Sequence, residues 1–210
     1  CAAACSSDHT IKGTETPEAA KLQGEHGDKT EYLHVASFGM GCDVADIAAV
    51  SHWHKKCGDL ALDLLEIGNT CGFIMELIEK KILTSEEVSQ WLGEKVSASW
   101  GDTEFIEKAI EAVAFQKNQF GQLFKDGVYQ GARRIEKMKG VSTIPYVVYG
   151  KGGSIINEEV RPFPVWAINM AVSSRGCCHL KGLSWLYKSE RKDISMALFG
   201  RPEAGEGYTP

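Results

Sequence analysis

The sequence contains no run of about 18 apolar residues, the length that a membrane-spanning helix requires. It also lacks an excess of positive charge, because 23 lysines and arginines stand against 28 aspartates and glutamates, a net charge of −5. We therefore expect no membrane span, and there is no electrostatic reason to expect a nucleic-acid partner. No charged segment followed by an apolar stretch opens the chain, so we expect no secretory signal and a cytoplasmic location.

The remaining composition is that of an ordinary globular protein, with 210 residues, 43% hydrophobic and 24% charged. Seven cysteines are an odd number, which argues against a disulfide framework and favours reduced thiols, some of them ligands. The chain begins on Cys1 instead of methionine. We expect a fragment, or one piece of a split polypeptide, whose partners include the remainder of the same enzyme.

Apolar residues recur mostly at helical spacing, which predicts a mainly α fold with roughly six helices and little sheet. We divide the chain into a cluster-binding turn and loop at 1–30, a helical domain at 31–140, and a strand, turn and loop region at 141–210. The one strand predicted from its β-branched and aromatic residues covers residues 143–149.

Several helix boundaries follow from local signals. Asp43 is predicted as the N-cap of a helix, and the segment 68–70 as a break. Thr84 and Glu87 have the spacing of a capping box ahead of a further helix. Residues 121–138 are predicted to form one helix.

Cys1 and Cys5 are spaced so that a tight turn brings both thiolates to one metal cluster. An iron–sulfur cluster is normally held by four thiolates, so two ligands would have to come from outside this sequence. The alternative is that both cysteines are incidental, since the spacing alone is weak evidence.

Two acidic residues stand at the starts of apolar stretches. Glu31 precedes such a run, where a carboxylate can exchange protons; the alternative is a solvated glutamate at the start of an element. His34, three residues on, can join Glu31 as a metal pair. Asp63 lies among leucines, so we expect a partner such as the amine of a heterocycle, or alternatively a helix N-cap.

The segment 175–181 has the strongest local composition for a ligand site. Arg175 and Lys181 suit an anion such as phosphate, and His179 suits proton transfer or a hydrogen bond. Gly176 lets the backbone approach a ligand closely. The alternative is a loop with core cysteines and a surface histidine.

Other cysteines and histidines are assigned no site. Cys42, Cys57 and Cys71 are spaced like small core residues. His52 and His54 flank a tryptophan and do not share a helix face, so both are expected on the surface.

Taken in order, five segments resemble the tungsten-containing aldehyde ferredoxin oxidoreductase family. Cys1 and Cys5 are similar to the last two thiolates of its CxxCxxxC motif, and Leu62–Thr70 to its Leu-Asp-x-x-x-x-Gly-Asn-Thr segment. The other three segments are Thr30-Glu31-Tyr32, Trp100-Gly101-Asp102 and Ala171–His179, the last resembling Ala-Thr-Ser-Asn-Arg-Gly-x-x-His.

The resemblance implies a helical fold that is incomplete without an N-terminal β domain. It implies a tungsten or molybdenum bis-pyranopterin beside a [4Fe-4S] cluster held partly by Cys1 and Cys5. Glu31 and His179 would handle protons, while Asp63, Lys181 and Arg175 would bind the cofactor. The implied reaction oxidises an aldehyde to a carboxylic acid and passes electrons to ferredoxin or an electron-transfer subunit. We also expect a homo-oligomer.

One departure from the family pattern leaves the substrate open. Arg161-Pro162-Phe163-Pro164 stands where the family usually carries Asp-Pro-Arg-Gly. The alternative within the family is a class II benzoyl-CoA reductase subunit, which acts on an acyl-CoA and reduces an aromatic ring; His34 or His26 would then be an additional proton donor. The alternative outside catalysis is a helical scaffold or electron-transfer subunit.

Overall fold

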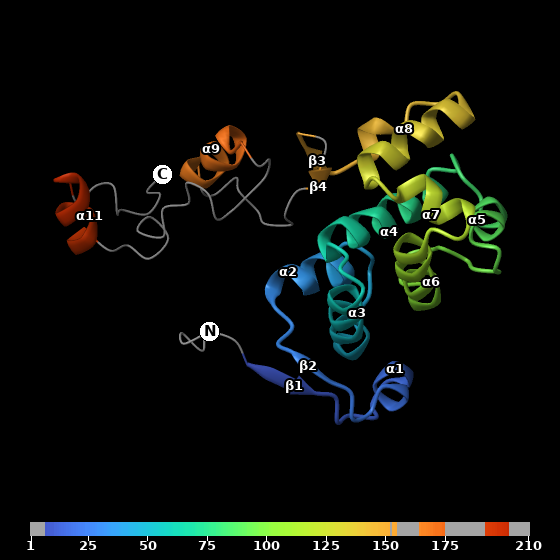
Figure 1. The fold of residues 1–210 in the computed structure, drawn as a ribbon, viewed down its shortest axis with the longest axis horizontal. Helices are drawn as coiled ribbons and strands as arrows, with labels where there is room; N and C mark the ends of the chain where they lie inside the picture. The colour runs from blue at the N-terminus through green and yellow to red at the C-terminus, as the bar shows by residue number, and fades with distance from the viewer. Residues whose placement is uncertain (1–6, 152, 155–163, 175–191, 202–210) are drawn as a thin grey trace. The chain divides into compact units, whose positions relative to one another are not determined.

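The computed structural model describes residues 7–151, 153–154, 164–174 and 192–201, and the chain forms two units, Cys1–Asn157 and Glu158–Pro210. The described residues are mainly helical, which confirms the predicted fold class (Figure 1). No helix among them is both long enough and apolar enough to cross a membrane.

The first unit contains most of the described elements. In chain order they are β1 (Asp8–Thr10), α1 (Pro17–Lys21), β2 (His26–Asp28), α2 (Tyr32–His34), the π-helix η1 (Val35–Met40), α3 (Ile47–Asp59), α4 (Leu64–Glu79), α5 (Ser85–Leu92), α6 (Thr103–Phe115), α7 (Gln119–Phe124), α8 (Val128–Lys139), the 3-10 helix η2 (Ile144–Tyr146), β3 (Tyr149–Gly150) and β4 (Gly153–Ser154). The second unit contains α9 (Pro164–Val172) and α11 (Lys192–Phe199).

The region predicted as a turn and solvated loop at 1–30 has more structure than expected. β1 and β2 pair antiparallel, with His9 opposite Gly27, and α1 lies between them in the chain. Strands of three residues give almost no alternation to detect, so the sequence pattern did not reveal them.

Two predicted helix starts have different outcomes. The capping box of Thr84 and Glu87 is confirmed, because each side chain accepts the other's main-chain N–H at the start of α5. Asp43 as an N-cap was wrong: Asp46 caps α3 by accepting from Ala48 and Ala49, and Asp43 has a positive φ of 58°.

Three further element predictions were wrong. The predicted break at 68–70 lies inside α4, and the predicted helix at 121–138 is divided into α7 and α8 at Gly127, whose φ is +88°. Within the predicted strand at 143–149, residues 144–146 form the 3-10 helix η2 and Tyr149 alone lies in a strand, β3. Pro145 cannot donate to a strand ladder and fits the first turn of a helix.

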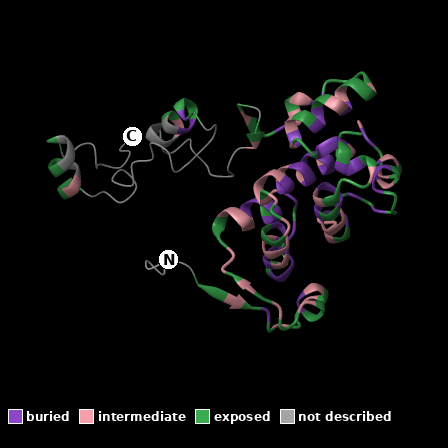
Figure 2. Cartoon of the chain, viewed as in Figure 1, coloured by how far each residue is buried: buried purple, intermediate pink, exposed green. Residues whose placement is uncertain are grey.

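α4 belongs to the core of the first unit: it contacts α3, α6 and α8, and many of its residues are buried (Figure 2). Phe73, Ile74, Met75 and Leu77 are all at most 3% exposed. Cys42, Cys57 and Cys71 are completely buried free thiols in the same core. Their predicted role as small core residues is thereby confirmed.

Small residues allow η1 to approach α4 closely. A Cβ at Gly72 would lie 2.5 Å from the carbonyl oxygen of Gly41, and one at Gly68 would collide with the hydroxyl of Ser37. The Ser37 hydroxyl donates to the carbonyl oxygen of Leu64 at 3.5 Å. The π-helix is therefore held directly against the first turns of α4.

His52 of α3 connects the β1–β2 region to α6 and is half-buried, not on the surface as predicted. Its Nδ1 lies 2.8 Å from a carboxylate oxygen of Glu25, and its Nε2 lies 3.4 Å from one of Glu107. Hydrogen bonding to Glu107 and then to Glu25, against the effect of burial, raises the pKa of His52 above 6.5. Burial opposes ionisation of Glu107, but hydrogen bonds from His52 and Lys56 hold its pKa at about 2.

We expect Gly72→Ala to lower the free energy of unfolding by about 1–3 kcal/mol, because its Cβ meets a backbone carbonyl that cannot rotate away. Gly58→Ala is the control, since Gly58 lies in α3 with no atom within 4 Å of an added Cβ, and it should stabilise by about 0.5–1 kcal/mol. Urea denaturation measures both. Equal stability of the two variants would contradict the close packing.

The ion pairs of His52 predict a pH-dependent stability. Because the pKa of His52 is raised in the folded state, its ion pairs contribute fully to the free energy of unfolding below pH 6.5. This contribution is lost as the pH rises through the folded-state pKa. His52→Gln should lower the free energy of unfolding by roughly 1.5–3 kcal/mol just below pH 6.5 and by less at about pH 9. Urea denaturation across this range measures the difference.

His26→Gln is the matched control, because His26 and its partner Asp8 have side chains 62% and 69% exposed. Its effect should stay small at every pH. A cost of His52→Gln that does not change with pH would show that His52 is not charged in these ion pairs.

Candidate functional site

The predicted site residues at the two ends of the sequence lie outside the described residues. These are Cys1, Cys5, Arg175, His179 and Lys181. The structure therefore places two of the predicted site residues, Glu31 and Asp63, which both belong to the first unit.

Glu31 is the N-cap residue of α2. Its main-chain N–H donates to Nδ1 of His34 at 3.0 Å, and its carboxylate lies 3.5 Å from the Lys29 ammonium. The Glu31 side chain is 57% exposed, as the alternative of a solvated glutamate at the start of an element expects. An exposed carboxylate at this position can accept a proton from a group brought to it from outside the described residues.

Asp63 is the N-cap residue of α4, which is the structural alternative given for it from the sequence. Its Oδ1 accepts the main-chain N–H of Leu65 at 2.9 Å and of Glu66 at 3.2 Å. Both bonds end on Oδ1, so Oδ2 is the oxygen available to accept from an amine or amide of a ligand. Capping a helix and binding a heterocycle are therefore compatible roles for the one carboxylate.

Glu66, in the first turn of α4, connects this helix to two other elements. Its carboxylate accepts the main-chain N–H of Val128, at the start of α8, and that of Ser154 in β4 at 3.0 Å. The end of the helix that carries Asp63 is thus tied to α8 and β4 as well as to η1.

Three of the segments that resemble the aldehyde ferredoxin oxidoreductase family meet around η1. The first, Thr30–Tyr32, leads into α2, which η1 continues and which contacts α4. The second contains Asp63 and the first half of α4. The third, Trp100–Asp102, is held to the turn that follows η1 by the Gly101 N–H, which donates to the Cys42 carbonyl at 2.8 Å. Segments 30–70 residues apart in sequence thus form one junction.

A hollow of about 300 Å³ opens between η1, α4 and Trp100, and neither Glu31 nor Asp63 lines it. Its polar lining side chains are Asn69 and Glu76 of α4, Trp100, and Tyr146 of η2. The Trp100 indole N–H donates to Glu79 at 3.0 Å, which fixes the ring at the rim. Sequence reasoning did not select Glu76 or Tyr146; the signal available was the position of Asn69 and Trp100 within the shared segments.

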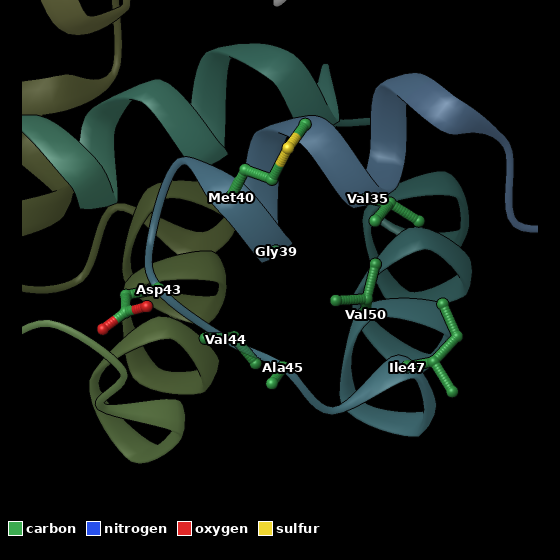
Figure 3. A pocket seen from close by; sticks show the side chains of 8 residues that line it. All are labelled: Val35, Gly39, Met40, Asp43, Val44, Ala45, Ile47 and Val50. Atoms are coloured by element: carbon green, nitrogen blue, oxygen red, sulfur yellow. The ribbon is translucent and has the colours of Figure 1, made fainter.

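A second hollow of about 370 Å³ is also lined by Met40 (Figure 3). Its lining is almost entirely apolar and consists of Val35, Gly39, Met40, Asp43, Val44, Ala45, Ile47 and Val50. Asp43 is the one charged member, and its carboxylate points away from the hollow in Figure 3. This hollow can receive an apolar group but offers no acid–base chemistry.

No three histidine, cysteine, aspartate or glutamate side chains in the described part of the chain are placed to hold a metal ion. Burial raises the pKa of the Cys42 and Cys57 thiols to about 12, and it raises that of Cys71 as well. These three cysteines therefore stay protonated, which is unsuited to metal ligation because the thiolate is the ligand.

Comparison with known proteins gives a match over nearly the whole chain. The profile of the family described as aldehyde ferredoxin oxidoreductase, domains 2 and 3, covers residues 1–207. The chain is 28% identical over 172 residues to a tungsten-containing aldehyde ferredoxin oxidoreductase of Thermococcus kodakarensis, and 27% identical over 172 residues to one of Pyrococcus furiosus. Each alignment covers 79% of this chain and 27% of the relative.

A third relative differs in its named substrate. The chain is 26% identical over 159 residues to an aliphatic sulfonate oxidoreductase, WOR-like subunit, of Pyrococcus furiosus, an alignment that covers 75% of this chain and 24% of that protein. The chain thus spans about a quarter of the length of the curated relatives it matches. Because the family profile covers residues 1–207, the chain belongs to the aldehyde ferredoxin oxidoreductase family.

Proposed function

We propose that this chain is part of an enzyme that oxidises an aldehyde to a carboxylic acid at a tungsten (or molybdenum) bis-pyranopterin. Electrons leave through a [4Fe-4S] cluster to ferredoxin or an electron-transfer subunit. The observation that supports this most is the junction at η1, where three segments similar to the family meet and Glu31 and Asp63 cap neighbouring helices. The other cofactor residues of the proposal are Cys1, Cys5, Arg175, His179 and Lys181.

The two described residues fit the cofactor by their chemistry. Asp63 is an exposed residue whose Oδ1 caps the helix, which leaves Oδ2 to accept from a pterin amine. The bound metal and pterins would supply the two-electron chemistry.

The protein's own contribution is proton handling and placement of the substrate. Oxidation of an aldehyde with water yields the carboxylic acid, two electrons and two protons, so a base beside the reacting carbon is needed. Glu31 supplies an accessible carboxylate to accept that proton, and His179 is the second proton-handling residue of the proposal. The apolar hollow beside Met40 is suited to the hydrocarbon part of a substrate or to a covering segment of the complete enzyme.

We expect Asp63→Asn to keep the fold and to lower the tungsten and pterin content of the intact, anaerobically purified enzyme. Asparagine caps a helix as well as aspartate does, whereas it cannot offer a charged acceptor. Asp63→Ala should in addition cost about 1 kcal/mol of stability through the lost cap.

Asp46→Asn is the matched control, since Asp46 caps α3 through the same pair of main-chain bonds. Metal analysis for tungsten and iron reads out both variants. An unchanged tungsten content in the Asp63→Asn enzyme would show that Asp63 does not bind the cofactor. Absence of both tungsten and iron from the unmodified enzyme would contradict the proposed function itself.

Glu31→Gln should leave the tungsten content unchanged and lower kcat by about 10²–10⁴-fold, the usual contribution of a general base. Glu86→Gln, an exposed glutamate on α5, is the control and should be neutral. Aldehydes, benzoyl-CoA and an aliphatic sulfonate are assayed side by side. Turnover unaffected by Glu31→Gln would favour a scaffold or electron-transfer subunit, and turnover of benzoyl-CoA alone would favour the ring reductase.

A further inference from the structure

The main-chain N–H of Glu31 is held by an unusual partner. A glutamate or glutamine three residues into a helix normally accepts the N–H of the N-cap residue, but here Nδ1 of His34 does so at 3.0 Å. Imidazole accepts through Nδ1 only when that nitrogen carries no proton. The bond therefore requires neutral His34 with its proton on Nε2.

The surroundings of His34 keep the ring neutral. It stacks on His54 of α3 with the ring centroids 3.8 Å apart and the planes inclined by 32°. Burial first, and then the neighbouring His54, lowers the pKa of His34 to about 4, against the opposing effect of Glu31. Two charged imidazoles at this separation would repel each other strongly.

His54 is disfavoured in its charged form as well. Burial lowers its pKa, and His9 of β1 acts in the same direction, while Asp28 of β2 and Glu31 oppose them. Nδ1 of His54 and Nε2 of His9 are buried and have no hydrogen-bond partner among the described residues. A proton added to Nδ1 of His54 would find no acceptor there, which disfavours the charged form of His54.

We propose that His34 is a positioning residue for Glu31: stacked on His54, it holds the Glu31 main-chain N–H and thereby fixes the start of α2 and the direction of the Glu31 side chain. The catalytic importance of this arrangement rests on the proposed function of Glu31. The hydrogen bond from the Glu31 N–H to neutral His34 is independent of that proposed function.

The proposal predicts how the bond responds to pH. Since the folded pKa of His34 lies below 6.5, its neutral form contributes fully above pH 6.5, and the contribution falls as pH drops toward the folded value of about 4. Below that value Nδ1 is protonated and releases the Glu31 N–H. The positioning is therefore present at neutral pH and lost in acid.

The test uses the full chain and nuclear magnetic resonance. The ¹⁵N shifts of His34 should show an unprotonated Nδ1 at neutral pH, and the Glu31 amide shift should titrate with a midpoint near 4. His34→Asn offers Oδ1 in place of Nδ1, whereas His34→Leu offers no acceptor. Hydrogen exchange of the Glu31 amide should be about five- to tenfold faster in His34→Leu and within about twofold of the unmodified chain in His34→Asn.

A protonated Nδ1 at neutral pH would overturn the proposal without any variant. Equal Glu31 exchange in His34→Leu and the unmodified chain would overturn it too. In the intact enzyme at equal tungsten content, His34→Leu should lower kcat with little change in KM, and His34→Asn should restore it. If the amide results hold while kcat stays unchanged, the positioning stands and the catalytic role of Glu31 fails.

Discussion

The structure depends on the close packing of the π-helix η1 against the first turns of α4. Gly41 and Gly72 bring two backbones together at a distance that no side chain permits, and Ser37 fills the space over Gly68. Because α2 runs directly into η1, this contact fixes α2 relative to α4. Two N-cap carboxylates, Glu31 and Asp63, are positioned by it, although neither takes part in the packing.

Local signals predicted correctly where no tertiary contact intervened, and the contact between η1 and α4 explains one prediction that failed. Caps and capping boxes are local, so Thr84 and Glu87 predicted the start of α5 correctly. The segment 68–70 was predicted as a break because glycine weakens isolated helices. There the glycine is needed for a tertiary contact, and the gain from packing outweighs the propensity. Asp43 failed as a cap for a related reason, since its positive φ serves the loop that joins η1 to α3.

The predicted helical fold and the family are confirmed, whereas the site is only partly accessible to sequence reasoning. Asp63 was recognised as an acid among leucines with two possible roles, and the structure shows one of them, the helix N-cap. His34 was noted only as a metal partner or proton donor. Its stacking on His54 joins residues 20 apart and leaves no pattern in the sequence. The same holds for Glu76 and Tyr146, which reach one hollow from different elements.

The central claim is that the N-termini of α2 and α4 face one metal–pterin cofactor. An anomalous difference map recorded at a tungsten absorption edge, from crystals of the intact enzyme, tests it most directly. The account predicts a single tungsten peak beside the carboxylates of Glu31 and Asp63. A tungsten peak surrounded by side chains from other parts of the enzyme would contradict it.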